Sequence, residues 1–396
     1  MEKLIQELCP KGVEFKELGE IGTLIRGNGL QKKDFTESGV GCIHYGQIYT
    51  YYGLFTDKTK SYVSPELAIK LKKAEKGNLV IATTSENDED VCKAVAWLGE
   101  ESIAISGDAH ILRHDQNPRY LAYFFQSSLF FDQKKKYITG TKVRRISGDN
   151  IAKIRIPLPP LPIQEEIVKI LNSFTELEAE LEAELEARKK QYKYYYKKLL
   201  LECANSKDIT LNEIGKVLMC KRIFKNETLA SGDVPFYKIG TFGKKPDAFI
   251  SQNIYDEYRT KYSFPKKGDI LLSASGTIGR RVIYDGHPGY FQDSNIIWID
   301  NDESKVLNKF LYYLYATVEW KTEGGTIQRL YNDSLKKIKI PVPPLGEQEH
   351  IVSILDKFDS LVNDISIGLP AELKARRQQY EYYRNKLLSF QEYGKQ

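Results

Sequence analysis

Hydrophobic residues recur at steps of three and four along one long stretch of the chain, the spacing of a single helix face. This stripe contains Ile163, Ile167, Ile170, Leu171, Phe174, Leu177, Leu181 and Leu185. Neither Gly nor Pro falls between Ile163 and the region of Leu201. The pattern therefore predicts one helix of about forty residues, on the order of 55–60 Å long.

A second helical stretch, near the C-terminus, is interrupted. It includes Ile365 and Leu373, and Gly368-Leu369-Pro370 divides it where Pro370 can restart a helix. A seam rich in tyrosine ends each stretch, with Tyr192, Tyr195 and Leu199 in the first and Tyr380, Tyr383 and Leu387 in the second. We expect the two helices to pack antiparallel. We expect the residues of these seams to pack between the helices or to contact a partner protein.

Isoleucines alternate with basic residues just before each helix, which is typical of a half-buried strand. They are Ile154 and Ile156 in one place and Ile338 and Ile340 in the other. Prolines follow at positions 157, 159 and 160 of the first stretch. Because proline has no N–H, we expect these residues to exclude ladder pairing and to form a stiff hinge.

The chain contains an internal duplication. Residues 154–174 and 338–358 share, without a gap, the pattern I-x-I-P-x-P-P-L-x-x-Q-E-x-I-V-x-I-L-x-x-F, and residues 187–200 match 375–388. Shorter matches upstream extend the repeat to about 190 residues per half. The globular parts differ between the halves far more than the helical parts, which indicates one frame that carries two different inserts.

These patterns predict a mixed α/β (α+β) fold. Two globular domains are separated by two long antiparallel helices, in a pseudo-two-fold, circular arrangement that brings the termini together. We expect residues 1–156 and 207–340 to form the two domains, and residues 157–206 and 341–396 to form the hinges and spacer helices.

Composition limits the class of protein. Hydrophobic residues make up 41% of the chain, and no apolar run approaches the ~18 residues of a membrane span. The five cysteines lie far apart without a Cys-x-x-Cys pair, which argues against disulfides or a zinc site and favours a cytoplasmic location. The net charge of +5 permits a nucleic-acid partner, and 26 tyrosines suit polar interfaces.

Several enzyme signatures are absent. There is no Gly-x-x-x-x-Gly-Lys phosphate loop, and Leu158 and Val342 occupy the polar position of an Asn/Asp-Pro-Pro-aromatic methyltransferase motif. The histidines have no spacing suited to a metal; they are His44, His110, His114, His287 and His350. We therefore expect no active site, metal or cofactor on this chain.

Three sets of residues suit contact with a nucleic acid, the partner that the net charge permits, since Arg, Lys, Asn and Gln can read base edges and Lys, Arg, Ser and Thr can hold phosphates. The first set lies early in each domain and comprises Arg26, Lys32 and Lys33, or Lys221, Arg222 and Lys225. The second is a loop of small residues with Ser275, Thr277, Arg280 and Arg281. The third precedes the hinge, with Lys142, Arg144 and Arg145 in one half and Gln328 and Arg329 in the other.

The two halves differ most at the second set. The counterpart of the 273–281 loop follows Thr83-Thr84-Ser85 and is acidic, with Glu86, Asp88, Glu89 and Asp90. We therefore expect the two domains to differ in any nucleic acid that they contact. For any one basic residue a solvated surface role is the alternative, and we expect the run Lys134-Lys135-Lys136 to be plain surface or to steer phosphates non-specifically.

The two duplicated motifs, I-x-I-P-x-P-P-L-x-x-Q-E-x-I-V and A-R-(K/R)-x-Q-Y-x-Y-Y-x-x-K-L-L, resemble the specificity subunits of type I restriction–modification systems over essentially the whole chain. The resemblance implies that each domain reads one half of a bipartite site in double-stranded DNA. It also implies that the helices set the gap and dock methyltransferase subunits, in a complex that includes motor-endonuclease subunits. S-adenosylmethionine, ATP and Mg would belong to those partners, and this chain would be non-catalytic.

The Leu-Glu-Ala-Glu units at Leu177, Leu181 and Leu185 resemble the spacer repeats of that family. One added unit lengthens a helix by about 6 Å and turns it about 40° beyond a full revolution, so such a helix suits an adjustable spacer. The second half departs from this pattern, because Gly368-Leu369-Pro370 replaces the array.

Two other interpretations of the chain stay open at this point. One is a coiled-coil scaffold with two protein-binding heads. The other is a fragment of a fused restriction–modification enzyme whose catalytic half lies on another chain or was lost. Sequence-specific DNA binding that weakens steeply with salt would exclude the scaffold, because only the specificity subunit and the enzyme fragment would bind DNA in this way.

Overall fold

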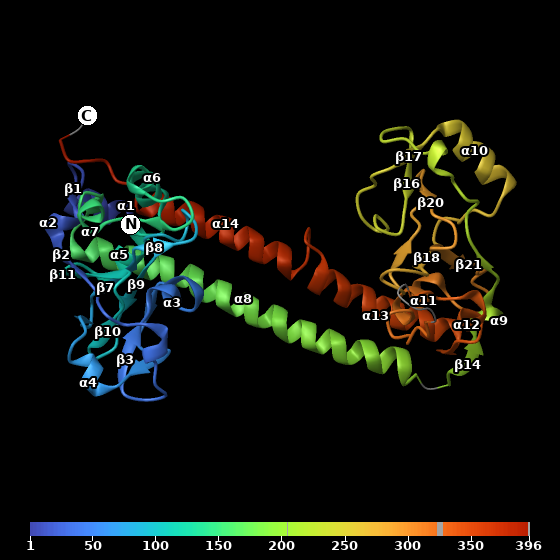
Figure 1. Ribbon diagram of the computed structural model, residues 1–396, viewed down its shortest axis with the longest axis horizontal. Coiled ribbons are helices and arrows are strands. Elements are labelled where there is room, and N and C mark those ends of the chain that lie inside the picture. The colour runs from blue at the N-terminus through green and yellow to red at the C-terminus, as the bar shows by residue number, and fades with distance from the viewer. Residues whose placement is uncertain (204, 323–327, 395–396) are drawn as a thin grey trace. The chain divides into compact units, whose positions relative to one another are not determined.

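The computed structural model describes residues 1–203, 205–322 and 328–394 (Figure 1). The chain divides into two compact units: unit 1 contains Met1–Glu182 and Glu372–Gln396, and unit 2 contains Ala183–Ala371. Helices α8 (Leu161–Leu201) and α14 (Leu369–Leu387) contribute residues to both units. The predicted mixed α/β fold, with two domains and long helices, is confirmed.

Unit 1 contains a five-stranded and a four-stranded sheet. The five-stranded sheet has the order β2 (Gly22–Arg26), β11 (Ala109–His114), β7 (Leu79–Ala82), β9 (Ala94–Trp97) and β4 (Phe55–Thr56). The four-stranded sheet has the order β5 (Ser61–Val63), β3 (Val40–Ile43), β10 (Ile103–Ile105) and β6 (Lys73–Ala74). Strands β7 and β9 are buried along their whole length, as their unbroken apolar sequences require.

Short helices complete unit 1: α1 (Glu2–Leu8), α2 (Leu18–Ile21), α3 (Tyr45–Thr50), α4 (Pro65–Ala68), α5 (Pro118–Phe124), α6 (Ser128–Lys134), α7 (Gly148–Ala152), and the 3-10 turns η1 (Lys32–Asp34) and η2 (Lys135–Tyr137). Local sequence sets where two of them begin. The Asn117 side chain caps α5, whose first residue is Pro118, and the Ser127 hydroxyl caps α6. Both helices pack their aromatic faces into the main core of the unit.

Unit 2 is built in the same way, with different loops. Its larger sheet has the order β15 (Val217–Leu218), β21 (Ile296–Ile299), β18 (Ile270–Ser273) and β19 (Arg281–Ile283), and its smaller sheet has the order β17 (Phe249–Ile250), β16 (Val234–Tyr237) and β20 (Tyr290–Phe291). Its helices are α9 (Leu211–Ile214), α10 (Gln252–Lys261), α11 (Asn308–Leu314), α12 (Asn332–Lys336) and α13 (Leu345–Asn363), with the 3-10 turn η3 (Lys225–Glu227).

A two-stranded ladder stands at the base of each long helix. Strand β13 (Arg155–Leu158) pairs with β1 (Glu14–Glu17), and β22 (Lys339–Val342) pairs with β14 (Lys207–Thr210). The expectation that Pro157 excludes ladder pairing is wrong, because Pro157 lies opposite Phe15 inside the ladder. A two-stranded ladder has an open outer edge, so a residue without an N–H can be accommodated there.

A buried glutamine fixes the hinge in each unit. Gln164 donates from Nε2 to the Pro159 carbonyl (2.9 Å) and accepts from the Asn117 N–H (3.2 Å). Gln348 does the same with the Pro343 carbonyl (2.7 Å) and the Leu307 N–H (2.8 Å). The repeated P-P-L-x-x-Q motif therefore ties each proline hinge to the N-terminus of a neighbouring helix through one buried amide.

The helices pack antiparallel within each unit. In unit 1 the Phe174 ring of α8 lies against Tyr383 of α14, with centroids 5.5 Å apart, and Arg377 of α14 binds Glu178 at 2.6 Å. In unit 2 the rings of Tyr192 and Tyr195 lie 5.9 and 6.0 Å from that of Phe358 in α13. Leu199 and Leu387 are half-buried against the cores of unit 2 and unit 1, respectively, and Tyr380 packs beside Phe174.

Two spacer positions differ from the sequence prediction. Ile365 is not in a helix: it lies in the turn between α13 and α14 and is 81% exposed. Leu177 lies in α8 but is 47% exposed, because Glu178 takes the inward position there and meets Arg377. Leu181 and Leu185 are half-buried, and Leu373 is buried in α14.

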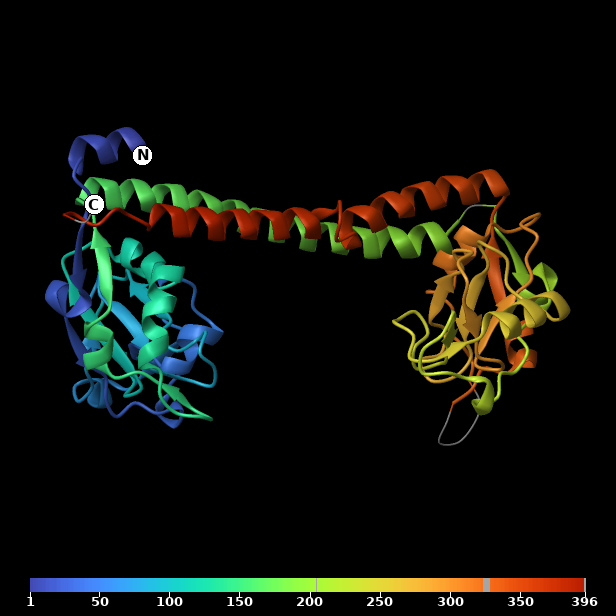
Figure 2. The ribbon, with the colours of Figure 1, turned by 90° about the horizontal axis from the view of Figure 1, so that it is seen from above.

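Both termini belong to unit 1 (Figure 2). The Val13 N–H donates to the Gln391 carbonyl at 2.9 Å, and the Tyr393 N–H donates to the Val13 carbonyl at 2.9 Å. Arg155 of the hinge strand also binds Glu392 at 2.6 Å. The expected meeting of the two ends of the chain is thus present inside one unit.

Candidate nucleic-acid interface

One end of the five-stranded sheet in unit 1 gathers polar residues from distant segments. We call this end the unit 1 rim and define it by Arg26, Thr84, Asp108, Arg144 and Arg145. Strand β2 ends there at Arg26, and β11 begins beside it, since the register places His110 opposite Arg26. The Thr84 hydroxyl donates to Asp108 Oδ1 at 3.4 Å.

A short ladder completes the unit 1 rim. Strand β12 (Arg144–Arg145) pairs with β8 (Thr84–Ser85), with Arg144 opposite Ser85 and Arg145 opposite Thr84. Arg145 is exposed, whereas Arg144 is half-buried and binds Asp88 through Nε at 2.8 Å. The ladder therefore places Arg144 and Arg145 of the third predicted set beside Thr84 and Ser85, after which the acidic loop of unit 1 begins.

Unit 2 has the same rim, which we define by Arg222, Ser275, Asn295 and Arg329. Arg329 forms a bridge with Ser275, the counterpart of the pair formed by Arg145 and Thr84. The Ser275 hydroxyl donates to Asn295 Oδ1 at 2.7 Å. Asn295 precedes β21 as Asp108 precedes β11, so the repeat reproduces the rim residue by residue.

The loops that follow β8 and β18 differ in charge and in support. In unit 1 the loop carries Glu86, Asp88, Glu89 and Asp90, and Lys93 binds Asp90 at 2.6 Å. In unit 2 the loop consists of Gly276, Thr277, Ile278 and Gly279, followed by Arg280 and Arg281. Gly276 and Gly279 have φ values of +64° and +79°, a conformation that glycine adopts without strain.

The two arginines of unit 2 have other partners. Arg280 donates from Nη1 to the Phe242 carbonyl at 3.0 Å. The Arg281 guanidinium lies over the Tyr312 ring, 4.7 Å from its centroid, and its charge opposes the burial that raises the pKa of Tyr196 to about 12. Arg281 therefore packs against helix α11, and its contact with DNA stays a prediction.

The remaining predicted residues fall at several places. Lys33 lies in η1, and Lys142 is exposed in the bend before β12. Arg222 binds Asp293 at 2.8 Å, and Thr277 is exposed in its loop. Thr322 donates to the Gln328 side chain at 2.9 Å. Positions 325–327 of the third predicted set lie outside the described residues.

The expectation that Lys134 is plain surface is wrong. Lys134 is 2% exposed, and its Nζ donates to the carbonyls of Glu89 (3.0 Å) and Val91 (2.6 Å). Burial lowers the pKa of this lysine. Lys134 thus ties the acidic loop of unit 1 to the end of α6. The sequence did contain a signal for this burial, because Lys134 lies four residues after the buried Phe130 on one helix face.

Sequence reasoning also missed a histidine at the unit 1 rim. His110 is 9% exposed and lies opposite Arg26 in the sheet. Burial lowers its pKa, and the charge of Arg26 lowers it further. A neutral imidazole at this place leaves Arg26 as the cation of the pair. Among the described residues, no group of three or more His, Cys, Asp or Glu side chains is arranged to hold a metal.

The type I restriction modification DNA specificity domain matches the chain twice, over residues 10–187 and 204–375. A putative type I restriction enzyme specificity subunit of Haemophilus influenzae is 56% identical over 283 residues, which cover 69% of this chain and 72% of that protein. The EcoR124I/EcoR124II specificity subunit of Escherichia coli is 34% identical over 266 residues, covering 62% of this chain and 65% of that protein.

Solved structures share the fold. The HsdS subunit of Thermoanaerobacter tengcongensis aligns with a TM-score of 0.59 at 17% identity, covering 96% of this chain and 97% of that one. A chain from a type I restriction–modification assembly aligns with a TM-score of 0.64 at 17% identity, covering 96% and 98%. The double match of the family model spans most of the sequence, one copy for each half of the duplication. The chain therefore belongs to the family of type I restriction–modification DNA specificity subunits.

Proposed function

We propose that each unit reads one half of a bipartite DNA site through its rim. The observation that carries this proposal is the repeated pairing of Arg145 with Thr84 and of Arg329 with Ser275, next to loops of opposite charge. An arginine held beside a small polar residue can reach a base edge or a phosphate, and a change of loop changes what is read.

The two rims offer different chemistry to a DNA groove. Carboxylates accept hydrogen bonds from cytosine N4 and repel phosphates, whereas arginine donates to guanine and to phosphates. The loop of unit 1 supplies mainly carboxylates, and the rim of unit 2 supplies Arg222, Arg329 and the Asn295 amide. Two unlike half-sites, and hence an asymmetric target, are expected from this difference.

The remainder of the complex supplies the chemistry. We propose that this chain is non-catalytic, that methyltransferase subunits dock on its long helices, and that motor-endonuclease subunits cut the DNA. S-adenosylmethionine, ATP and Mg then bind to those partners. The Leu-Glu-Ala-Glu units of α8 set the gap between half-sites. No helix among the described residues could span a bilayer, and all five cysteines are free thiols. We place the protein in the cytoplasm on the cysteine pattern.

The test is a pair of matched variants in the complex reconstituted with its methyltransferase subunits. After the methylated sites of the wild type are mapped, Arg145→Ala should relax or weaken recognition of one half-site and Arg329→Ala that of the other. A base contact is worth about 1–3 kcal/mol, so each effect should be roughly fivefold or more. Lys76→Ala is the control, because Lys76 is exposed and precedes β7 at the opposite end of the sheet. If both variants weaken the same half-site, or neither acts, the proposal is wrong.

A further inference from the structure

Strands of both sheets of unit 1 end at the unit 1 rim. Strands β3 and β10 run parallel, with Ile43 beside Ile105, so they end at the same edge of the four-stranded sheet. After β10 the chain passes through Ser106 and Asp108, a residue of the rim, into β11. After β3 it enters helix α3, which packs against β7. Helix α3 is therefore part of this end of unit 1, although the function proposed above does not use it.

Hydrogen bonds fix the first turn of α3. The Tyr45 N–H donates to Ser106 Oγ at 2.8 Å, in the turn that leads to the rim. His44, which is 8% exposed, caps the helix. Its Nδ1 accepts from the Gly46 N–H at 3.3 Å, and its own N–H donates to Gln47 Oε1 at 3.0 Å. The side chains of this turn are thus carried on a backbone that is held in place beside the rim.

Two tyrosines lie on one face of α3, because Tyr45 and Tyr49 are four residues apart. Their rings are 6.3 Å apart between centroids, and both are half-buried against the core cluster that contains Ala82 and Ala109, at the rim ends of β7 and β11. Among the described residues, neither hydroxyl has a hydrogen-bond partner or is a buried polar atom. The core therefore holds the rings, while the hydroxyls stay available to a ligand.

Carboxylates lie near the Tyr49 hydroxyl. Burial raises the pKa of Tyr49, and the neighbouring Tyr45 raises it further. Three carboxylates act in the same direction: Glu86 and Asp90 of the acidic loop, and Asp108 of the rim. Their negative charge repels a phosphate, whereas a carboxylate accepts hydrogen bonds from the amino groups on base edges. Because its pKa is raised, Tyr49 keeps its proton and can donate to such an edge as well as accept from it.

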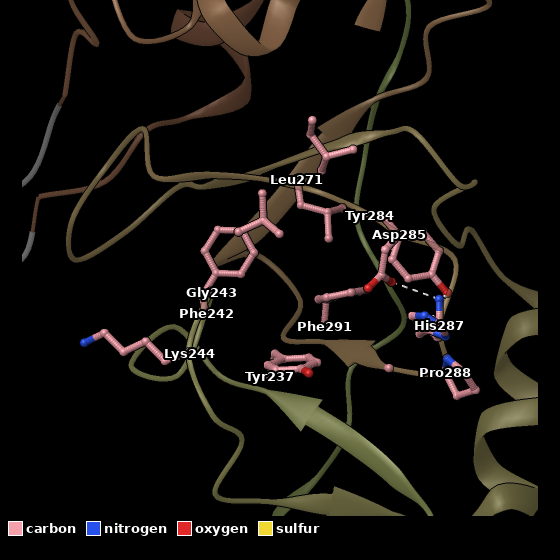
Figure 3. A pocket seen from close by; sticks show the side chains of 13 residues that line it. Tyr237, Phe242, Gly243, Lys244, Leu271, Tyr284, Asp285, His287, Pro288 and Phe291 are labelled. Atoms are coloured by element: carbon pink, nitrogen blue, oxygen red, sulfur yellow. Dashed lines mark hydrogen bonds between the residues drawn. The ribbon is translucent and has the colours of Figure 1, made fainter. Parts of the chain in front are cut away.

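The corresponding segment of unit 2, residues 238–248, contains no tyrosine. Strand β16, the counterpart of β3, runs parallel to β20, and the Ile239 N–H donates to Gln292 Oε1 at 2.9 Å, as at the start of α3. The chain then forms turns instead of a helix. Figure 3 shows Phe242 of this segment at the wall of a cavity and Lys244 extending outward. The hydroxyl pair of α3 is therefore a feature of unit 1 and not of its repeat.

We infer that Tyr45 and Tyr49 read base edges in the half-site of unit 1, next to those read by the acidic loop. The inference rests on the function proposed above, in which this half-site is read at the unit 1 rim. A tyrosine hydroxyl can donate and accept hydrogen bonds, and its place beside carboxylates favours contact with bases over contact with phosphates. Tyrosine also loses little conformational entropy on binding, since its side chain has only two χ angles.

The test uses the assembled methyltransferase complex and pools of DNA duplexes in which each position of a mapped half-site is randomised in turn. The half-site of unit 1 is the one that Arg145→Ala alters. Methylation of each sequence is then counted for the wild type, Tyr45→Phe and Tyr49→Phe. Phenylalanine removes the hydroxyl and keeps the packed ring, so both variants should fold. We expect each variant to lose about fivefold or more in discrimination at one or two positions of this half-site, and none in the other half-site.

Tyr51→Phe is the matched control. Tyr51 follows the last residue of α3 and is 57% exposed, and its ring centroid lies 4.4 Å from Lys60 Nζ. The same chemical change should have no effect on discrimination there.

Three results would overturn the inference: wild-type discrimination in both Tyr45→Phe and Tyr49→Phe, an equal loss in Tyr51→Phe, or a uniform weakening at all positions, which would indicate phosphate contact. If Arg145→Ala alters a half-site and the tyrosine variants do not, the inference alone is wrong. If the wild-type complex shows no site-specific methylation, the function proposed above is wrong and the inference is wrong with it.

Discussion

The rims of the two units are built on equivalent residues, yet their loops are held by different means. In unit 1 the buried ammonium of Lys134 anchors an acidic loop through two backbone carbonyls. In unit 2 the Trp320 indole packs directly on Gly279 of a glycine-rich loop. The sheet, the ladder and the hinge stay the same while the loop and its anchor change together. A recognition surface can therefore be replaced without disturbing the frame that carries it.

The largest expected effect is the loss of stability when the buried glutamine of either proline hinge is replaced. Gln164→Leu and Gln348→Leu each remove a buried amide and leave its carbonyl and N–H partners without a hydrogen bond. At about 1–3 kcal/mol for each of the two unpaired groups, each variant should lose roughly 2–6 kcal/mol of stability and about 4–24 °C in Tm. Thermal unfolding by calorimetry measures both values.

Equal losses at Gln164 and Gln348 would show that the two hinges are energetically equivalent. The control is Gln378→Leu, which makes the same chemical change at an exposed residue of α14 and should shift Tm by less than about 1 °C. If one hinge tolerates leucine and the other does not, the frame is not the common part of the two units.

Lys134→Met tests the anchor of unit 1. Methionine keeps much of the apolar stem but leaves the carbonyls of Glu89 and Val91 unpaired in the core, which should cost about 2–4 kcal/mol. Amide hydrogen exchange should rise in residues 86–92, and recognition should weaken for the unit 1 half-site alone. Lys136→Met, at an exposed position of the same lysine run, should change neither. An equal weakening of both half-sites would contradict separate anchoring.

Gly279→Ala tests the anchor of unit 2. An added Cβ would lie 2.2 Å from Trp320 Nε1, at a residue whose φ is +79°. Strain and the displaced indole should together cost about 2–3 kcal/mol. Methylation of sites altered in the unit 2 half should become less selective, while selectivity for the other half stays. Gly268→Ala makes a matched control, because Gly268 also has positive φ (+98°) but open space around its Cβ position. The comparison fails if the two variants behave alike.

The frame could be predicted from the sequence because its signals are local. The apolar spacing of α8 and the absence of Gly and Pro give a single helix, and Leu161–Leu201 is what forms. The burial of Lys134 could not be predicted in the same way, because its partners lie more than forty residues away in the sequence. The pairing of Pro157 could not be predicted for a related reason. Only the two-stranded ladder provides the open edge at which a proline can be accommodated.

The rim was predicted in part. The repeat matched residues 140–145 with 325–329, and Arg145 and Arg329 lie on the two rims opposite the equivalent residues Thr84 and Ser275. Charge alone, however, does not say where a side chain points. Arg281 was chosen for its charge and its loop, and in the structure its guanidinium lies over the ring of Tyr312. Ile365 fitted the helical spacing, but the chain turns between α13 and α14.

The smallest expected effect is on stability at low pH. It arises at a position in one strand where the two units carry different residues. His114 in β11 corresponds to Asn301 after β21, and burial lowers the pKa of His114 from 6.5 to about 4. As the pH falls from 6.5 towards 4, the unfolded chain takes up a proton that the folded unit does not, so unit 1 loses stability in that window. The loss at pH 4.5 should be about 1–2 kcal/mol, after allowance for the partial exposure of the imidazole.

His114→Asn installs the residue of the other unit and removes this titration. The drop in Tm between pH 7 and pH 4.5 should become smaller by a few degrees, whatever the change in Tm at pH 7. His287→Asn serves as the control, because His287 is exposed in unit 2 and its replacement should leave the pH dependence unchanged. If the slope of Tm against pH is the same in His114→Asn as in the wild type, the buried imidazole is not what makes unit 1 the more acid-sensitive of the two.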